Sequence, residues 1–410
     1  MTRKRLFPWL ALAALVLGAL AVWFYPAYRT RLIWRWEMLT TYVRGIIYPA
    51  APVPIADPQT LETELPPTAT PRPTATPLPG PTATPEPSPT PLPPSVSLKA
   101  PLYERQDINN CGPATLSMAL KMYGWQGDQF AISDIIKPVP QDRNVNPDEM
   151  TFYVNNYAGW LRIITRVNGD LSLLKRLLAG GYPVIIETVD LADAPFYPND
   201  DLWMAHYLLL TGYDDASGTF MTQDSFRGAN IPVPYEALNT DWEPFNRVYM
   251  VLYFPGDEDY LSGLLGPDWD AAANRQRALE FSQQAVEEQP DNAFRWFNLG
   301  NNYLYFEQYN EAAKAFDAAR NLGLPQRMLR YQFGPFIAYF HTFRTDDLLT
   351  LTEYALQRTP NSEEAMLWRG WALYRQGQKA QAVDLWQQAL AARPNYPDAL
   401  YALDFARANP

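Results

Sequence analysis

The sequence predicts two folded parts, an α+β domain over residues 98–256 and an all-α solenoid over residues 269–410. An N-terminal transmembrane helix and a Pro/Thr-rich linker precede them. Three observations predict this order. An apolar run followed by a proline-crowded segment opens the chain. Short helical patterns and buried-strand runs then alternate up to about residue 255, and beyond them prolines recur at a nearly constant interval.

Composition limits the classes of function. The 410 residues are enough for more than one domain, and the formal net charge is -11. Residues 1–50 carry seven basic and one acidic side chain, +6, which leaves -17 for the rest. An acidic body of this kind argues against nucleic acid as a partner. One cysteine and two histidines allow no internal disulfide and no three-histidine metal site, so we predict no metal and no cofactor.

Residues 1–50 are predicted to form a membrane anchor and a juxtamembrane segment. Three basic residues at positions 3–5 precede an apolar run over residues 6–25, about long enough to cross a bilayer at ~1.5 Å per residue. The competing interpretation is a cleaved signal peptide, which would make the protein secreted. Either one places the folded parts outside the cytoplasm if the N-terminus stays inside. Residues 28–48 read as an amphipathic extension near the membrane surface.

Residues 51–97 are predicted to be a disordered stalk. Proline crowds the segment, and the sequence Pro-Thr-Ala-Thr-Pro occurs at 67–71, 73–77 and 81–85. Such a segment cannot bury a core and favours extended polyproline II. We therefore expect it to act as a spacer between the membrane and the folded parts.

The one cysteine, Cys111, lies where a polar loop gives way to a helical pattern. Apolar residues follow at helical spacing up to Gly124, a plausible helix end, and Pro113 falls in the first turn, where its missing N–H costs nothing. Cys111 would then sit at a helix N-terminus, where free N–H groups and the helix dipole favour a thiolate. The sequence predicts a reactive cysteine at this position.

A predicted β-hairpin brings a histidine and an aspartate together. Residues 204–213 and 219–223 read as its two strands, joined by a turn at 214–218. If Tyr213 pairs with Thr219, His206 and Asp224 face the same side, and a slip by one residue would separate them. An aspartate that binds one imidazole nitrogen leaves the other to take a thiol proton. The three residue types together match the arrangement of a cysteine nucleophile with its base.

These residues resemble a known family. Three motifs are similar to those of the double-glycine, bacteriocin-processing cysteine peptidases. They are Gln106 with the run from Asn110 to Ala114, His206 with the Gly-Tyr-Asp run at 212–214, and Asp224 within the Gln-Asp-Ser run at 223–225. The similarity covers residues 98–255 and is closest to the stand-alone, peptidase-like branch of that family, within the papain-like superfamily. It implies a papain-like fold and a catalytic set of Cys111 as nucleophile, His206 as general base, Asp224 as the residue that orients it, and Gln106 as oxyanion-hole donor. Gln106 lies five residues before the cysteine, where many relatives have six.

Each of these residues also has an ordinary structural interpretation. Cys111 can be a small buried hydrophobe, His206 a satisfied strand histidine, Asp224 a turn or cap residue, and Gln106 a loop amide. An inactive relative that only binds peptides is the corresponding interpretation of the whole domain.

The last part of the chain is predicted to be a repeat array. Residues 257–268 read as an acidic, Gly-containing linker, and prolines at 290, 325, 360 and 394 then recur at intervals of 35, 35 and 34 residues. Trp296, Leu299, Gly300 and Tyr303, followed by Ala312 and Phe316, resemble the tetratricopeptide repeat. Residues 327–360 form a degenerate repeat, and residues 397–408 a capping helix. The many aromatic residues and His341 are expected to pack within the repeats, which offer a groove for a protein partner.

The leading hypothesis is a membrane-tethered, extracytoplasmic cysteine peptidase that acts on peptides or proteins. Acyl transfer through the same thioester is the second hypothesis. The third is a non-catalytic adaptor that presents the repeat groove beside an inert peptidase-like domain.

Overall fold

The structure of the chain, a computed structural model, describes residues 12–20, 26–56, 91–139 and 145–409. The chain divides into two compact units. Residues 1–51 and 191–202 belong to the first unit, and residues 52–190 and 203–410 belong to the second. The candidate site and the helical repeats both lie in the second unit.

The first unit is built on α2 (Pro26–Ile47), which covers most of the predicted juxtamembrane extension. The ring of Trp34 meets that of Phe196 edge-on, with 6.3 Å between centroids. A Cβ added at Gly45 would lie 2.4 Å from the Cβ of Tyr197, so only glycine fits there. Among the described helices, none is both long and apolar enough to cross a membrane. The predicted span, residues 6–25, lies largely outside the described residues.

In the described part of the second unit, seven strands form one sheet in the order β2-β7-β3-β4-β5-β6, with β1 paired to β4. The pairs β1–β4, β2–β7, β3–β7, β4–β5 and β5–β6 are antiparallel. The strands are β1 (Ser95–Ser97), β2 (Arg162–Arg166), β3 (Val184–Leu191), β4 (Trp203–Asp214), β5 (Thr219–Asp224), β6 (Gly228–Pro234) and β7 (Tyr249–Tyr253).

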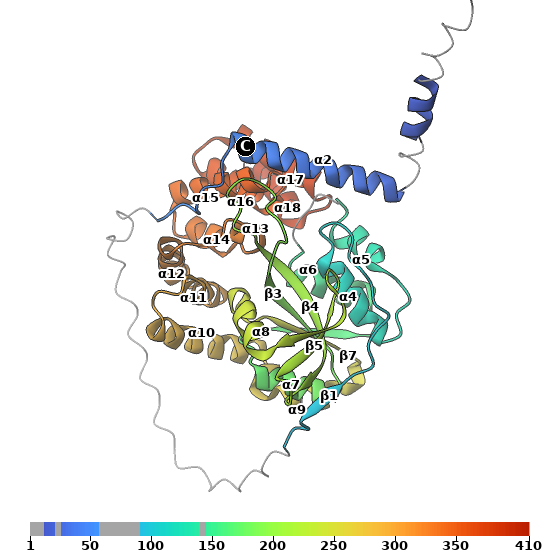
Figure 1. The fold of residues 1–410 in the computed structure, drawn as a ribbon. Helices are drawn as coiled ribbons and strands as arrows, with labels where there is room; N and C mark the ends of the chain where they lie inside the picture. Colours follow the sequence, from blue (N-terminus) through green and yellow to red (C-terminus); the bar gives the residue numbers. More distant parts are fainter. Residues whose placement is uncertain (1–11, 21–25, 57–90, 140–144, 410) are drawn as a thin grey trace, which may run out of the picture. The chain divides into compact units, whose positions relative to one another are not determined.

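Helices cover both faces of this sheet, which explains why its central strands read as unbroken apolar runs. Leu208 and Leu210 of β4 pack into one apolar cluster, while Tyr207 and Leu209 pack into the other. The second of these clusters also contains residues of α4 (Cys111–Met122), α5 (Gln129–Ile136) and α6 (Pro147–Tyr157), which lie together beside the sheet in Figure 1. The first contains residues of α7 (Leu171–Ala179), α8 (Tyr235–Trp242) and α9 (Glu258–Leu265).

The register of the β4–β5 hairpin differs from the predicted one near the turn and agrees with it near the site. Tyr213 pairs with Phe220, not with Thr219, which is a slip of one residue. A β-bulge between Leu210 and Gly212 then inserts an extra residue, so that Leu210 pairs with Thr222 as predicted. The predicted pairing at the turn was therefore wrong. The bulge nevertheless restores the predicted register near the site, which places His206 and Asp224 on the same side.

Residues 257–268, predicted to be a linker, are helical. They contain α9 and the 3-10 helix η4 (Gly266–Trp269), after η3 (Pro255–Asp257). Leu261 and Leu265, four residues apart, are buried against the sheet. Spacing of this kind places both on one helix face, so the acidic and glycine-rich composition concealed a packed helix.

The repeats follow as a series of helices. Three helical hairpins, α11–α12, α14–α15 and α16–α17, lie between a leading helix, α10, and a terminal helix, α18, which is the predicted capping helix. Residues 323–333, which include the short helix α13, separate the first two hairpins. The bounds are α10 (Ala271–Glu288), α11 (Ala293–Tyr305), α12 (Tyr309–Leu322), α13 (Met328–Tyr331), α14 (Gly334–His341), α15 (Thr345–Arg358), α16 (Glu363–Arg375), α17 (Lys379–Ala392) and α18 (Pro397–Ala408).

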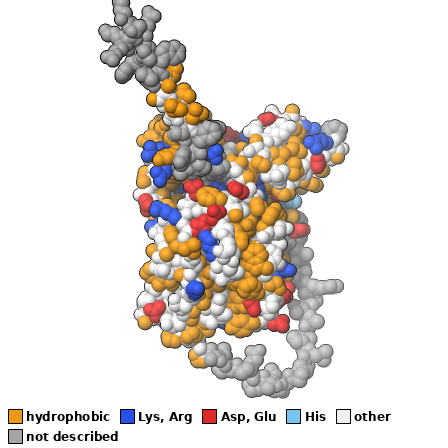
Figure 2. Space-filling view, turned by 90° about the vertical axis from the view of Figure 1, so that its right-hand side faces the viewer, with side chains coloured by type: hydrophobic (Ala, Val, Ile, Leu, Met, Phe, Trp, Pro, Cys, Tyr) orange, Lys and Arg blue, Asp and Glu red, His pale blue; other side chains and the backbone are white. Residues whose placement is uncertain are grey.

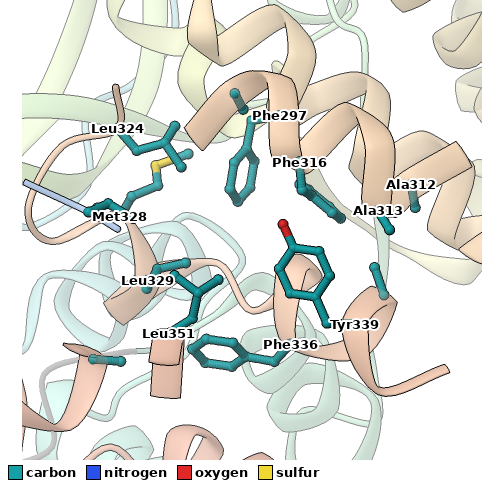
Figure 3. Packing of buried hydrophobic residues seen from close by; sticks show 14 of the residues in the cluster. Phe297, Ala312, Ala313, Phe316, Leu324, Met328, Leu329, Phe336, Tyr339 and Leu351 are labelled. Atoms are coloured by element: carbon teal, nitrogen blue, oxygen red, sulfur yellow. The ribbon is translucent and has the colours of Figure 1, made fainter. Parts of the chain in front are cut away.

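Aromatic residues of the repeats form their core. Figure 3 shows Phe297, Phe316, Phe336 and Tyr339 gathered between neighbouring helices, and all four are fully buried. A Cβ at Gly300 would lie 2.6 Å from the ring of Phe316, which accounts for the repeat's glycine. These aromatic residues pack, as predicted, rather than line a groove.

The repeats and the sheet domain are joined by polar contacts within the second unit. Asn246 Nδ2 donates to Asn302 Oδ1 of α11 at 2.8 Å, and both residues are buried. Arg393, just after α17, pairs with Glu149 of α6 at 2.7 Å. Because buried polar groups need partners, these contacts define a specific junction between the two parts.

Residues 52–56 are also held by the repeats. The buried guanidinium of Arg320 donates to the carbonyl oxygens of Pro54 and Ile55, each at 2.8 Å. The side-chain oxygen of Asn321 accepts the N–H of Ala56 at 3.0 Å. Three consecutive main-chain groups of an extended segment are therefore bound by the end of α12.

The opposite end of the predicted stalk is held by the sheet. The hydroxyl of Tyr213 donates to the carbonyl of Pro93 at 2.6 Å, and β1 then pairs with β4. The predicted stalk, 51–97, thus begins and ends with residues that pack on the same unit. Its middle, residues 57–90, lies outside the described residues.

Candidate active site

Cys111 is the first residue of α4, as its sequence setting predicted. The helix is fixed by packing, because its residues from Gly112 to Leu120 are all buried. The hydroxyl of Thr115 also donates to the carbonyl oxygen of Tyr207 in β4 at 3.2 Å. The strand that carries His206 therefore also sets the position of the helix that begins with Cys111, and the cysteine itself is partly exposed.

His206 and Asp224 are hydrogen-bonded across the end of the hairpin. His206 Nε2 lies 2.8 Å from Asp224 Oδ1, and each residue is only 3 % exposed. The same oxygen accepts the N–H groups of Phe226 and Arg227 at 2.8 and 3.0 Å. With Nε2 bound to a carboxylate, Nδ1 is the nitrogen left for Cys111.

The electrostatics of the site favour a protonated imidazole. Burial lowers the pKa of His206, but the hydrogen bonds with Asp224 and Cys111 and their negative charges outweigh it, and the pKa is raised to about 10. Burial acts to raise the pKa of Asp224, and its bonds to His206 and to two backbone N–H groups lower it overall. Near neutral pH the imidazolium of His206 therefore lies between the carboxylate of Asp224 and the side chain of Cys111.

Gln106 is tied to the end of β5. Its backbone N–H donates to the carbonyl of Ser225 at 2.9 Å, and its Oε1 accepts the Ser225 hydroxyl at 2.9 Å. Since the amide oxygen is engaged, the Nε2 group remains as a donor for a reacting carbonyl oxygen. Gln106 is thus connected to His206 by two hydrogen bonds and by the peptide link between Ser225 and Asp224.

The structure brings together the four residues singled out from the sequence, Gln106, Cys111, His206 and Asp224. Sequence reasoning did not give Ser225 a role, although it directly follows Asp224. It also missed Tyr103, whose hydroxyl donates to the carbonyls of Asp224 and Ser225 at 3.1 and 3.3 Å. No local pattern marks either one, because each contact joins segments about 120 residues apart.

A buried carboxyl group, Glu187 of β3, adjoins this site. Burial raises the pKa of this carboxyl group well above the ordinary value, and the electrostatic interaction with Cys111 raises it further. Its side chain hydrogen-bonds with Tyr207. Both causes favour the protonated form of Glu187.

The other histidine plays no part in this arrangement. His341 lies in α14, where its ring stacks on that of Tyr309 with 4.0 Å between centroids. Within the described ranges, no cluster of three or more His, Cys, Asp or Glu side chains is arranged to hold a metal ion.

Comparison with protein families agrees with this geometry. Residues 97–250 match the Peptidase_C39 like family, and residues 363–396 match the tetratricopeptide repeat. The chain joins a C39-like peptidase domain to tetratricopeptide repeats. This is the fusion predicted from the sequence, and the α+β class of the first domain and the helical class of the second are confirmed.

Individual relatives resemble parts of the chain. The cytochrome c-type biogenesis protein CycH of Pseudomonas aeruginosa is 27% identical over 150 residues, which are 33% of this chain and 37% of CycH. The chain therefore matches well under two thirds of that relative.

Solved structures with partial similarity include three peptidases. They are a C39-like peptidase from Bacillus anthracis (15% identity, 39% of this chain and 97% of that one, TM-score 0.31), the peptidase domain of Streptococcus ComA (16%, 38% and 98%, TM-score 0.29) and Xylellain, a cysteine protease from Xylella fastidiosa (16%, 40% and 87%, TM-score 0.32).

Proposed function

We propose that this protein is a cysteine peptidase whose C39-like domain hydrolyses peptide bonds with Cys111, His206 and Asp224. The observation that carries the proposal is the buried imidazole of His206, bonded to Asp224 at 2.8 Å and to Cys111 at the start of a helix. A buried imidazole with a strongly raised pKa between a thiol and a carboxylate matches the needs of nucleophilic catalysis.

Acylation begins with attack of the Cys111 thiolate on the carbonyl carbon of the substrate. The negative oxygen of the tetrahedral intermediate would accept hydrogen bonds from Gln106 Nε2 and from the Cys111 N–H, both preorganised by the fold. The C–N bond then breaks, and the His206 imidazolium gives its proton to the departing amine. The products are a free amine and a thioester on Cys111.

Deacylation reverses the role of His206. The neutral imidazole takes a proton from a water molecule, whose oxygen attacks the thioester carbonyl. The C–S bond breaks, the carboxylic acid leaves, and the thiolate–imidazolium pair is restored. Asp224 keeps Nε2 protonated throughout, so that Nδ1 is always the nitrogen that exchanges protons with the reacting groups.

The repeats are the proposed binding part for a protein partner or for a long substrate. Helical repeat stacks present extended surfaces of this type. Figure 2 shows one face of the whole molecule, not of the repeats alone, and on it acidic and basic side chains are interspersed with apolar ones. A mixed surface of this kind suits a peptide or protein partner better than nucleic acid.

A peptide-based electrophile, such as a peptidyl vinyl sulfone, tests the proposal. Wild-type protein should form a covalent adduct at Cys111, and Cys111→Ala should form none. His206→Ala should react at least about 10²-fold more slowly, within the range that general acid–base groups contribute. His341→Ala is the matched control, because it removes the other histidine, and it should react like wild type. Equal labelling of the His206→Ala and His341→Ala variants would refute the proposal.

Acyl transfer through the same thioester remains the alternative enzymatic outcome. Here an amine replaces water in the second step, and the product is a new amide. Mass spectrometry of peptide products with and without added glycine methyl ester separates the two, since only transfer incorporates the amine.

A non-catalytic adaptor is the second candidate function. The repeats and the partial similarity to CycH, named as a cytochrome c-type biogenesis protein, favour it. If the protein is an adaptor, the wild type and Cys111→Ala should bind the partner equally well. The peptidyl vinyl sulfone should then label the wild type no faster than it labels a free cysteine peptide.

The proposal also places the folded parts outside the cytoplasm, held by the N-terminal segment. The basic residues at 3–5 and the apolar run over 6–25 support this. Expressed full-length chain should stay in the membrane fraction after an alkaline carbonate wash, and a chain lacking residues 1–25 should not. Digestion of intact cells by added protease would then show on which side the C39-like domain lies.

A further inference from the structure

Gln129, the first residue of α5, is almost fully buried, at 4 % exposure, and its side chain holds the loop that carries Gln106. Its Oε1 accepts the backbone N–H of Asp107 at 2.7 Å and the side-chain amide of Asn110 at 2.9 Å. Its Nε2 donates to the carbonyl of Arg105 at 2.8 Å. The residues on both sides of Gln106 are thus bound by one side chain.

Glu104 in turn fixes the start of α5. Its Oε1 accepts the backbone N–H of Gln129 at 2.7 Å. Its Oε2 accepts the hydroxyl of Ser117 and pairs with Lys121, both on α4. The side chain that holds the loop is therefore itself anchored to the helix that begins with Cys111, which makes the whole arrangement rigid.

Gln129 also controls the residue before Cys111. Asn110 occupies the N-cap position of α4, where an Asn side chain usually accepts an N–H of the first turn. Here it makes no such bond, because its amide is turned to Gln129. Gln129 therefore binds the residue that precedes Cys111 as well as the residues on both sides of Gln106.

We propose that Gln129 is a positioning residue of the oxyanion hole. It holds the loop on both sides of Gln106 and the residue before Cys111, so that the Gln106 side chain and the Cys111 N–H keep the positions from which they donate to the reacting carbonyl. It touches no reacting atom itself. This inference rests on the proposed peptidase function.

The test compares two reactions of Cys111 in the full chain. Acylation by p-nitrophenyl acetate forms an oxyanion, whereas alkylation by iodoacetamide needs the thiolate but forms none. Gln129→Ala should slow acylation about 10²-fold, the scale of losing one oxyanion-hole donor, and change alkylation less than about twofold. Gln106→Ala should show the same pattern. The variant with both substitutions should be acylated at most about threefold more slowly than either single variant, since both substitutions act on the Gln106 side chain.

A second variant keeps the test decisive if Gln129→Ala folds poorly. Gln129→Glu retains the oxygen that accepts from Asp107 and Asn110 but loses the donor to Arg105, so its acylation rate should lie between those of wild type and Gln106→Ala. Equal losses in acylation and alkylation, or additive losses in the double variant, would show a general structural role and overturn the inference. Absence of acylation by wild type would remove the peptidase proposal as well. If Gln129→Ala were acylated as fast as wild type, the role of Gln129 would be refuted and the peptidase proposal would stand.

Discussion

The substitution Asp224→Asn separates the charge of the orienting residue from its geometry. Asp224 Oδ1 accepts all three close hydrogen bonds, from His206 Nε2 and from the N–H groups of Phe226 and Arg227. Oδ2 lies 3.9 Å from the nearest Arg227 side-chain nitrogen. An asparagine can therefore place its amide oxygen where Oδ1 lies and its amide nitrogen where Oδ2 lies, and His206 keeps the same tautomer.

The expected loss follows from replacing a charged acceptor by a neutral one. A hydrogen bond to a charged group contributes about 1 to 1.5 kcal/mol more than a neutral one, and about 1.4 kcal/mol is a tenfold change in rate. Asp224→Asn should thus slow acylation of Cys111 about tenfold. Asp224→Ala, which removes the acceptor altogether, should slow it on the order of 10³-fold, within the range of general acid–base catalysis.

The pH profile gives a second measurement on the same variant. The Asp224 hydrogen bond and charge are among the causes that raise the pKa of His206, so their weakening lowers that pKa. The alkaline limb of the acylation rate should move to lower pH in Asp224→Asn. An asparagine variant as slow as the alanine variant, or an unmoved alkaline limb, would refute this account of Asp224.

Three further predictions concern orientation, pH and stability. Ser225→Ala releases the amide oxygen of Gln106, and it should lower acylation by p-nitrophenyl acetate about three- to tenfold while alkylation by iodoacetamide stays unchanged. Because the pKa of His206 rises from 6.5 to about 10 on folding, its contribution to stability is complete below pH 6.5 and is lost as the pH rises through 10. The difference in urea-unfolding free energy between wild type and His206→Gln should therefore shrink as the pH rises from 6.5 to 10. A difference that stays constant over this range would contradict the prediction. Arg320→Leu removes a buried cation from Asp347, which keeps Arg344 as its other partner, and should cost about 1.5–3 kcal/mol in the same assay, whereas the exposed control Arg407→Leu should cost about 0–1 kcal/mol.

Local pattern was sufficient to predict the elements that carry the site. Helical spacing after Cys111 predicted α4, and alternation with turn residues predicted the β4–β5 hairpin. The bulge in β4 was not predictable, because its partner contacts are tertiary. The Gln223 amide donates to the hydroxyl of Thr211, the residue at the bulge, at 3.0 Å. A rule of strict alternation has no means of placing an extra residue there.

Contacts between distant segments were beyond sequence reasoning. Ser225 meets Gln106 across 119 residues and Arg320 meets Pro54 across 266, and neither pair shares a periodic pattern. The last case also shows how composition misleads. Proline content predicted a disordered stalk from residue 51, yet the carbonyl groups of Pro54 and Ile55 are bound by Arg320.

The two halves of the candidate site depend on one dipeptide at the end of β5. Asp224 orients the base, and Ser225 orients Gln106, so the proton-transfer group and the oxyanion donor are set by neighbouring residues. Their position along β4 depends in turn on the bulge: if the pairing of Tyr213 with Phe220 continued along the strand without it, β5 would be shifted by one position near the site and Asp224 would face the other side. Asp224→Ala, which removes the acceptor of His206, should therefore slow both acylation and fast alkylation of Cys111 in a chain whose repeats remain folded. The substitution Ser225→Ala, by contrast, should affect acylation alone.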